Sequence, residues 1–313
     1  MSELVATVSR RDPSVKRSAG SSEPALDLVR LRPLMARTSG SPAVRIGLID
    51  GPVSLDHPHF AKANVLAVAD SRRACRVGGS EACRHGTLVA GVLVSEKGSG
   101  APAICPRCTL LIRPIFFEEE PATTQLPAAS MDEVALAIVE TIDAGAHILN
   151  LSVALTEPSS QAERRMHEAL DYAARRGVIV VAAAGNRATL GSSVITRHPW
   201  VVPVTACDLH GRPMADTTLS HSAGKRGVAA PGIGVVSLSP GPTMQPLAGT
   251  SAATPFVTGA FALLKSLVPS ANGGQLRSAV TRSGVRRGTV VPPLLDGVGA
   301  VRLLSQPMAK IGI

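Results

Sequence analysis

Long apolar runs are missing from this chain of 313 residues, since no stretch reaches the roughly 18 consecutive apolar residues that a membrane-spanning helix requires. The first forty residues also lack the apolar run of a secretory signal peptide, which predicts a cytoplasmic protein with no membrane partner. Aromatic residues make up only 2%, too few for a platform on which nucleic-acid bases stack, so no nucleic-acid partner is expected. With 45% hydrophobic and 18% charged residues, the chain can bury a sizeable core, which excludes disorder throughout.

The positive charge of the chain is confined to its two ends. Lys and Arg number 32 against 23 Asp and Glu. Residues 1–40 hold seven basic and four acidic groups and residues 261–313 hold seven and one, whereas residues 41–260 hold eighteen of each. The central part is therefore neutral, and its charge does not predict an acidic partner.

Composition divides the chain into an extension, a main domain and a tail. Residues 1–40 mix Ser, Arg, Pro and Gly and are expected to be partly disordered, residues 41–305 form the domain, and residues 306–313 are the tail. Short β-branched runs alternate in the domain with longer helical stretches, which predicts an α/β fold with a mostly parallel central sheet between helices. The expected strands are 44–50, 64–70, 110–116, 147–153, 178–184 and 200–206.

Three helices are marked by their first residues. Ser130 with Glu133 and Ser160 with Glu163 fit the capping box, in which the two side chains satisfy free amides of the first turn. A third, very apolar helix is expected to begin near Thr250.

Two polar residues lie at the carboxyl ends of expected apolar strands. Asp50 ends the run 44–50 before Gly51-Pro52, and Asn186 follows the run 178–184. The carboxyl edge of an open α/β sheet is where ligands bind, so both side chains could serve a site there. Each could equally stabilise a turn, the Asp as an Asx-turn.

Two further candidates lie at the starts of helices. His85 stands in the segment RHGTLVAG. A histidine at a helix start is more often structural than catalytic, and the neighbouring Gly and Ala residues shift that balance toward catalysis. Ser251 stands in GTSAATP, where it could be either a helix cap or a nucleophile near the free amides of a helix N-terminus.

Taken together, the segments IGLIDGPV, RHGTLVAG, VAAAGN and GTSAATP resemble, in this order, the motifs of the subtilisin-like serine proteases. The resemblance implies a subtilisin-like three-layer fold and a catalytic triad in which Ser251 is the nucleophile, His85 the general base and Asp50 the group that orients it. It also implies that Asn186 and the Ser251 backbone N–H form the oxyanion hole. The residues expected to bind substrate are Ser152, Val153, Ala154, Ala183, Ala184 and Gly185.

Two positions depart from the family pattern. Val153-Ala154 stands where many members have Leu-Gly or Gly-Gly, which is expected to narrow one wall of the substrate cleft. Ala252 stands where a Met often follows the nucleophile, which is expected to alter the floor beside Ser251. The side-chain preference of familiar members therefore does not carry over.

A narrower resemblance concerns the biological substrate. The segments IDGPVSLDHPHF, APAICPRCTLLIRPIF and ETIDAGAHILNLS are similar to the proteases that cut precursor peptides in cyanobactin pathways. This implies an endopeptidase acting on a ribosomally made, modified precursor peptide. The alternatives are a subtilase of broad specificity and a non-catalytic peptide-binding scaffold of the same fold. No cofactor is expected, and the oligomeric state is left open.

The five cysteines permit three interpretations. Cys105 and Cys108 form a C-x-x-C motif, but the other close pair, Cys75 and Cys83, is separated by seven residues, too many for a typical zinc ribbon. A disulfide between Cys75 and Cys83 is a second possibility. Free thiols, as in a reducing cytosol, are the favoured prediction, with no metal site.

An acidic run, Glu118-Glu119-Glu120, follows the expected strand 110–116. Such runs are usually solvated. If the run faces the cleft, it would favour basic substrate residues before the scissile bond.

Overall fold

Continuous burial along most of the central strands places the sheet between two apolar layers. The computed structural model describes residues 22–68, 74–77, 79–116, 118, 129–153, 160–286 and 288–305. Successive strand residues such as Leu48 and Ile49, or Val180 and Val181, belong to two different apolar clusters. Because neighbouring strand residues point to opposite faces, both faces of the sheet are covered, as the continuous apolar runs predict.

The main sheet has the strand order β2-β3-β1-β4-β5-β6-β7, and every pairing is parallel. A second sheet is the antiparallel pair β8-β9. The strands are β1 Arg45–Asp50, β2 Asn64–Ala67, β3 Thr109–Pro114, β4 Ile148–Leu151, β5 Ile179–Ala183, β6 Val202–Cys207, β7 Val228–Pro231, β8 Val235–Ser239 and β9 Thr243–Leu247. All six predicted strands are confirmed, whereas β7 and the β8-β9 hairpin were not anticipated.

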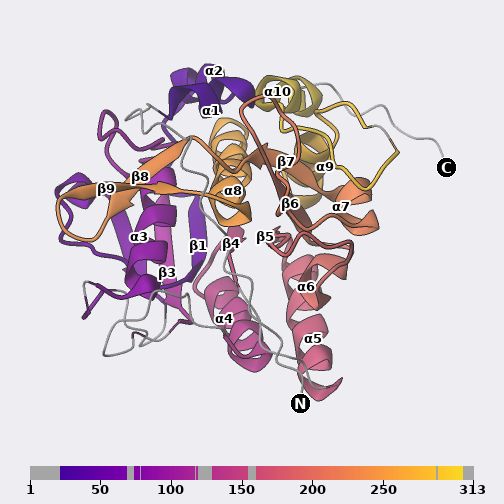
Figure 1. Ribbon diagram of the computed structural model, residues 1–313, viewed down its shortest axis with the longest axis horizontal. Coiled ribbons are helices and arrows are strands. Elements are labelled where there is room, and N and C mark those ends of the chain that lie inside the picture. Colours follow the sequence, from indigo (N-terminus) through magenta and orange to yellow (C-terminus); the bar gives the residue numbers. More distant parts are fainter. Residues whose placement is uncertain are drawn as a thin grey trace, which may run out of the picture.

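Helices α3 and α8 pack on one face of the sheet, and α4 and α5 pack on the other (Figure 1). The helices are α1 Glu23–Leu28, α2 Arg32–Arg37, α3 Glu81–Val94, α4 Met131–Asp143, α5 Ser160–Arg176, α6 Val194–Arg197, α7 His221–Arg226, α8 Thr250–Leu267, α9 Gly273–Thr281 and α10 Gly297–Ser305, with a 3-10 turn at Pro58–Phe60. The three-layer α/β architecture expected from the sequence is thus present.

The predicted helix starts are largely confirmed. The Ser130 hydroxyl accepts a hydrogen bond from the Glu133 N–H at 3.1 Å, which caps α4. Helix α8 begins at Thr250, with Gly249 as its N-cap. Helix α5 begins at Ser160, and the residues immediately before it lie outside the described part of the chain.

Part of the expected N-terminal extension belongs to the packed domain. Leu26 of α1, Leu34 of α2 and Leu31 between the two helices are buried in the same apolar cluster as residues of α8. The N–H of Gly297, at the start of α10, donates to the Val29 carbonyl, and Arg30 pairs with Asp296 at 3.0 Å. The predicted boundary at residue 40 therefore does not coincide with the edge of the packed structure.

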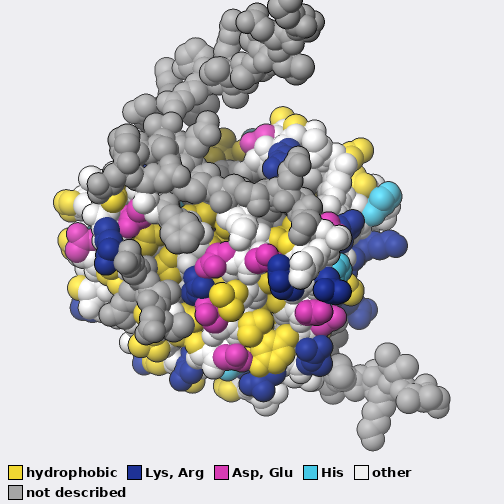
Figure 2. Space-filling view, turned by 90° about the horizontal axis from the view of Figure 1, so that it is seen from below, with side chains coloured by type: hydrophobic (Ala, Val, Ile, Leu, Met, Phe, Trp, Pro, Cys, Tyr) yellow, Lys and Arg dark blue, Asp and Glu magenta, His cyan; other side chains and the backbone are white. Residues whose placement is uncertain are grey.

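The lower side of the molecule in Figure 1, where α4 lies, carries both signs of charge. Arg113 pairs with Glu133 and Glu140 of α4, and Arg165 of α5 pairs with Asp132. Figure 2, seen from this side, shows basic and acidic side chains interleaved. In the part of the chain that the structure describes, no helix is long and apolar enough to cross a membrane.

Candidate active site

Asp50 and His85 form a buried pair at the end of β1. The Asp50 Oδ1 atom lies 2.6 Å from His85 Nδ1 and also accepts the Gly51 N–H at 2.7 Å. Asp50 is fully buried and His85 is 7% exposed. Since a carboxylate accepts hydrogen bonds, the shared proton lies on Nδ1, which leaves His85 Nε2 unprotonated and able to act as a base.

The pair depends on a close approach between β1 and α3. A Cβ atom added to Gly86 would lie 2.4 Å from the carbonyl oxygens of Gly51 and Pro52, and one added to Gly51 would lie 1.9 Å from the Ala82 carbonyl. Only glycine fits at either position. The glycines of the two motifs therefore bring the helix carrying His85 against the end of the strand carrying Asp50.

The Asp50 carboxylate makes His85 a stronger base than an isolated imidazole. Burial disfavours charge on His85, but the charge and hydrogen bond of Asp50 outweigh burial and raise the pKa of His85 above its usual value. The other carboxylate oxygen, Asp50 Oδ2, is buried and has no hydrogen-bond partner among the described residues. The hydrogen bonds of the Asp50 carboxylate within the described residues are therefore those with His85 and the Gly51 N–H.

Ser251 is the second residue of α8 and is partly exposed. Its N–H lies in the first turn of the helix and makes no hydrogen bond within the described residues, so it is free to donate to a ligand. Helices α3 and α8 pack against each other, and the structure has no hydrogen bond between Ser251 and His85 in the described chain. Catalytic hydrogen bonds are often long in unliganded enzymes and tighten when substrate binds.

Asn186 is oriented by the residue before Ser251. Its Oδ1 atom accepts the Thr250 N–H at 2.9 Å. Because a backbone N–H can only donate, this hydrogen bond identifies the atom facing Thr250 as the Asn186 oxygen. The Asn186 Nδ2 atom therefore points away from the Thr250 N–H and can donate to another acceptor. Sequence reasoning named Asn186 but missed Thr250, whose hydroxyl also accepts the Gly185 N–H at 3.3 Å.

A cleft of about 830 Å³ adjoins Ser251 and Asn186. It is lined by five of the six residues expected to bind substrate: Ser152, Val153, Ala183, Ala184 and Gly185. The sixth, Ala154, lies outside the described residues, so the narrowing of the cleft expected there stays a prediction. Ala252 is fully buried in the apolar core, and the altered floor expected beside Ser251 stays a prediction.

Hydrogen bonds through a buried asparagine connect one wall of the cleft to α8, the helix that carries Ser251. Asn150 of β4 donates from Nδ2 to the Ser152 hydroxyl at 3.3 Å and accepts from the Thr258 hydroxyl of α8 at 2.8 Å. Asn150 and Thr258 are fully buried. Sequence reasoning did not assign a role to either residue, since both look like ordinary positions in apolar segments.

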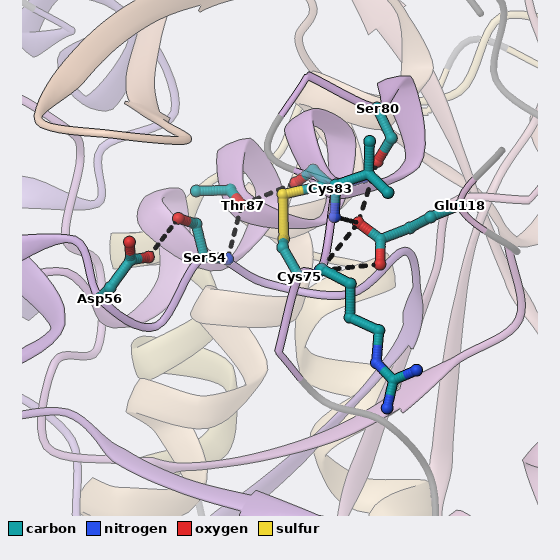
Figure 3. The surroundings of a disulfide bond; sticks show 9 residues. Ser54, Asp56, Cys75, Ser80, Cys83, Thr87 and Glu118 are labelled. Carbon is teal, nitrogen blue, oxygen red and sulfur yellow. Dashed lines mark hydrogen bonds between the residues drawn. A yellow bond between two sulfur atoms is a disulfide. The ribbon is translucent and has the colours of Figure 1, made fainter. Parts of the chain in front are cut away.

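The favoured prediction of free thiols is wrong for two of the five cysteines. Cys75 and Cys83 form a disulfide, which excludes the four-thiolate zinc site because both sulfurs are used (Figure 3). Cys105, Cys108 and Cys207 are free and buried. The prediction failed because it assumed a reducing compartment; the cytoplasmic location itself stays a prediction.

Glu118 does not face a substrate. Its carboxylate accepts the N–H groups of Arg76 and Val77 and the hydroxyl of Ser80, the N-cap of α3 (Figure 3). One Glu118 oxygen lies within 4.8 Å of both disulfide sulfurs, but bonded sulfurs are not thiolate ligands. The expected attraction of basic substrates is therefore wrong for Glu118, and Glu119 and Glu120 lie outside the described residues.

Residues 41–299 match the model of the subtilase family, peptidase S8. The chain belongs to this family. The chain is 31% identical, over 218 residues, to the thermostable alkaline protease of Halalkalibacterium halodurans; the match covers 69% of this chain and 56% of that protein. Subtilisin Savinase of Lederbergia lenta is also 31% identical, over 66% of this chain and 71% of its own. The chain thus spans about half the length of several of the curated relatives that it matches.

Solved structures of peptide maturation proteases are similar over most of the chain. A mutant of the protease domain of PatA superposes with a TM-score of 0.75 at 29% identity, covering 85% of this chain and 96% of that one. The prenylagaramide maturation protease PagA superposes with a TM-score of 0.77 at 26% identity, covering 88% and 99%. The PatG macrocyclase is 20% identical, so it supports only the shared subtilase fold.

Proposed function

We propose that this subtilase is a serine endopeptidase in which Asp50, His85 and Ser251 form the catalytic triad. The observation that carries the proposal is the buried Asp50–His85 hydrogen bond, which leaves an unprotonated Nε2 atom on a helix packed against the one that carries Ser251. Membership of the subtilase family supports the same assignment.

In the proposed reaction, His85 Nε2 accepts the proton of the Ser251 hydroxyl while the Ser251 oxygen attacks the substrate carbonyl carbon. The resulting oxyanion accepts hydrogen bonds from Asn186 Nδ2 and the Ser251 N–H. The protonated His85 then donates to the leaving amine, which gives an acyl-enzyme, and water releases the acid by the reverse sequence. Asp50 holds the required imidazole tautomer and stabilises its cation.

The triad is tested with a fluorophosphonate probe, which labels an activated serine. We expect stoichiometric labelling at Ser251, identified by mass spectrometry of the labelled peptide. Ser251→Ala is the matched variant and should fold, as judged by its circular dichroism spectrum, without being labelled. Equal labelling of the variant, or no labelling of the wild type, would favour the non-catalytic scaffold.

The proposed substrate is a ribosomally made precursor peptide that is cut at a defined site. Support comes from the similarity to PatA and PagA, which are described as patellamide and prenylagaramide maturation proteases. A broad-specificity subtilase is the second candidate, since the alkaline proteases and Subtilisin Savinase are also similar. Comparison of kcat/KM on casein with kcat/KM on precursor peptides encoded near this gene separates the two. Efficient single-site cleavage of a precursor with slow hydrolysis of casein supports maturation, and rapid multi-site digestion of casein supports broad specificity.

A further inference from the structure

The cleft beside Ser251 carries an excess of positive charge. Among the described residues that line it, the charged ones are Glu163, Arg187 and Arg197, that is, two basic residues and one acidic residue. The remaining lining residues are apolar or uncharged. A substrate side chain that enters this cleft therefore meets more positive than negative charge from the described lining residues.

Arg187 and Arg197 differ in whether a nearby carboxylate already compensates their positive charge. Arg197 of α6 lies 3.8 Å from a Glu163 oxygen, and both side chains are substantially exposed. Arg187 has no ion-pair partner within the described part of the chain. A guanidinium without a carboxylate partner is the stronger site for a ligand anion, since its charge is not already compensated.

Arg187 is also placed next to the reacting atoms. It directly follows Asn186, and its N–H donates to the Thr218 hydroxyl at 3.3 Å, which anchors its backbone. The wall formed by Ala183, Ala184 and Gly185 has only small side chains. The cleft as a whole, with a volume of about 830 Å³, is large enough to hold a glutamate side chain.

We propose that the cleft selects an acidic side chain in the substrate residue whose carbonyl group is attacked, with Arg187 as the main specificity-determining residue. The proposal rests on the proposed endopeptidase function, because it places that carbonyl between Ser251 and Asn186. A carboxylate can accept charge-assisted hydrogen bonds from the Arg187 guanidinium, whereas a lysine would meet a like charge. Arg197 contributes less to binding the substrate carboxylate because the nearby Glu163 carboxylate already partly balances its positive charge.

The test uses peptidyl diphenyl phosphonates, which do not require knowledge of the natural substrate. Attack by the Ser251 oxygen forms a serine–phosphorus bond and expels phenoxide, and the proton of the hydroxyl passes to His85. Three probes are compared that differ only in the side chain next to phosphorus, which corresponds to Glu, Gln or Lys. We expect the Glu probe to label Ser251 about tenfold faster than the Gln probe, as for one charge-assisted hydrogen bond, and the Lys probe to be the slowest.

Variants then assign the preference to a residue. Arg187→Gln should bring the ratio of the Glu and Gln labelling rates close to one, and Arg187→Glu should make the Lys probe faster than the Glu probe. Arg302→Gln, which removes an exposed arginine of α10 outside the cleft lining, should leave the ratio unchanged. Raising the salt concentration to about 1 M, where the Debye length falls to about 3 Å, should reduce the wild-type ratio.

The outcomes separate this inference from the proposed function. If a fluorophosphonate labels Ser251 but the Glu and Gln probes react equally, or none of the three peptide probes reacts, the acidic preference is wrong and the endopeptidase proposal stands. A Glu preference that survives Arg187→Gln also overturns the role of Arg187. If neither the fluorophosphonate nor any peptide probe labels Ser251, the proposed function fails together with the inference.

Discussion

Gly249→Ala tests how the proposed oxyanion hole is held together. Gly249 precedes α8 with φ +84, and a Cβ atom added there would lie 2.7 Å from Asn186 Nδ2 and 3.0 Å from its Oδ1. Both contacts are with the side chain whose Oδ1 accepts the Thr250 N–H at 2.9 Å. The methyl group therefore has room only if the Asn186 amide moves away from the position that this hydrogen bond gives it.

Two effects of the substitution have different magnitudes. Only glycine adopts φ +84 with ψ −166 without strain, so alanine costs about 1–3 kcal/mol of folding free energy, which lowers the melting temperature by roughly 2–5 °C for a chain of 313 residues. Displacing Asn186 should lower kcat by about 10²–10³, the loss found when one oxyanion donor is removed from a subtilisin. Gly98→Ala is the matched control, since Gly98 has φ +85 and nothing within 4 Å of an added Cβ.

The assay measures kcat, KM and melting temperature for the two glycine variants, for Asn186→Ala and for the double variant Gly249→Ala/Asn186→Ala. We expect similar melting temperatures for Gly249→Ala and Gly98→Ala, with kcat lowered only in the former. If Gly249 acts through Asn186, the double variant should be no slower than Asn186→Ala. Wild-type kcat in Gly249→Ala would refute the reasoning, and so would additive losses in the double variant.

Further predictions concern the buried pair and the cysteines. Because catalysis requires a neutral imidazole and Asp50 raises the pKa of His85, kcat/KM should rise with pH through an apparent pKa above 6.5. The same raised pKa stabilises the fold below the unfolded pKa of His85, and this stabilisation is lost as pH rises through the folded pKa, which pH-dependent denaturation can detect. Asp50→Asn should lower the apparent pKa and slow the reaction by about 10⁴-fold, whereas an unchanged pH profile would contradict the pairing. Cys75 and Cys83 are eight residues apart, so reduction of their disulfide should lower the free energy of unfolding by about 2.5 kcal/mol and the melting temperature by roughly 5 °C. The reductant should have no effect on the melting temperature of the Cys75→Ser/Cys83→Ser variant. Burial raises the pKa of Cys207 to about 12, so iodoacetamide should leave it unmodified at pH 8 until the protein is denatured, and rapid modification of the native protein would refute its burial.

Local sequence was sufficient to predict the main strands and the positions of Asp50 and Asn186. Apolar β-branched runs specify buried strands, and a turn must follow where the run ends, so both polar residues fall at the carboxyl edge of a parallel sheet. Strand β7 and the β8-β9 hairpin were missed because their apolar runs are short and are interrupted by polar residues or proline. Helices α1 and α2 were missed because each has only six residues and is stabilised by packing on the core.

The tertiary structure alone decided which separated residues meet. The sequence left the pairing of Cys75 with Cys83 as one of three interpretations, and it did not indicate that Glu118 turns toward the loop before α3. The hydrogen bond that orients Asn186 likewise joins segments far apart in the chain. The charged residues that line the cleft also come from separate segments. The sequence determined the family and six strands of the main sheet and supplied the candidate reactive groups, because local patterns encode them. Their orientation and the character of the cleft depend on distances across the fold, which local patterns do not encode.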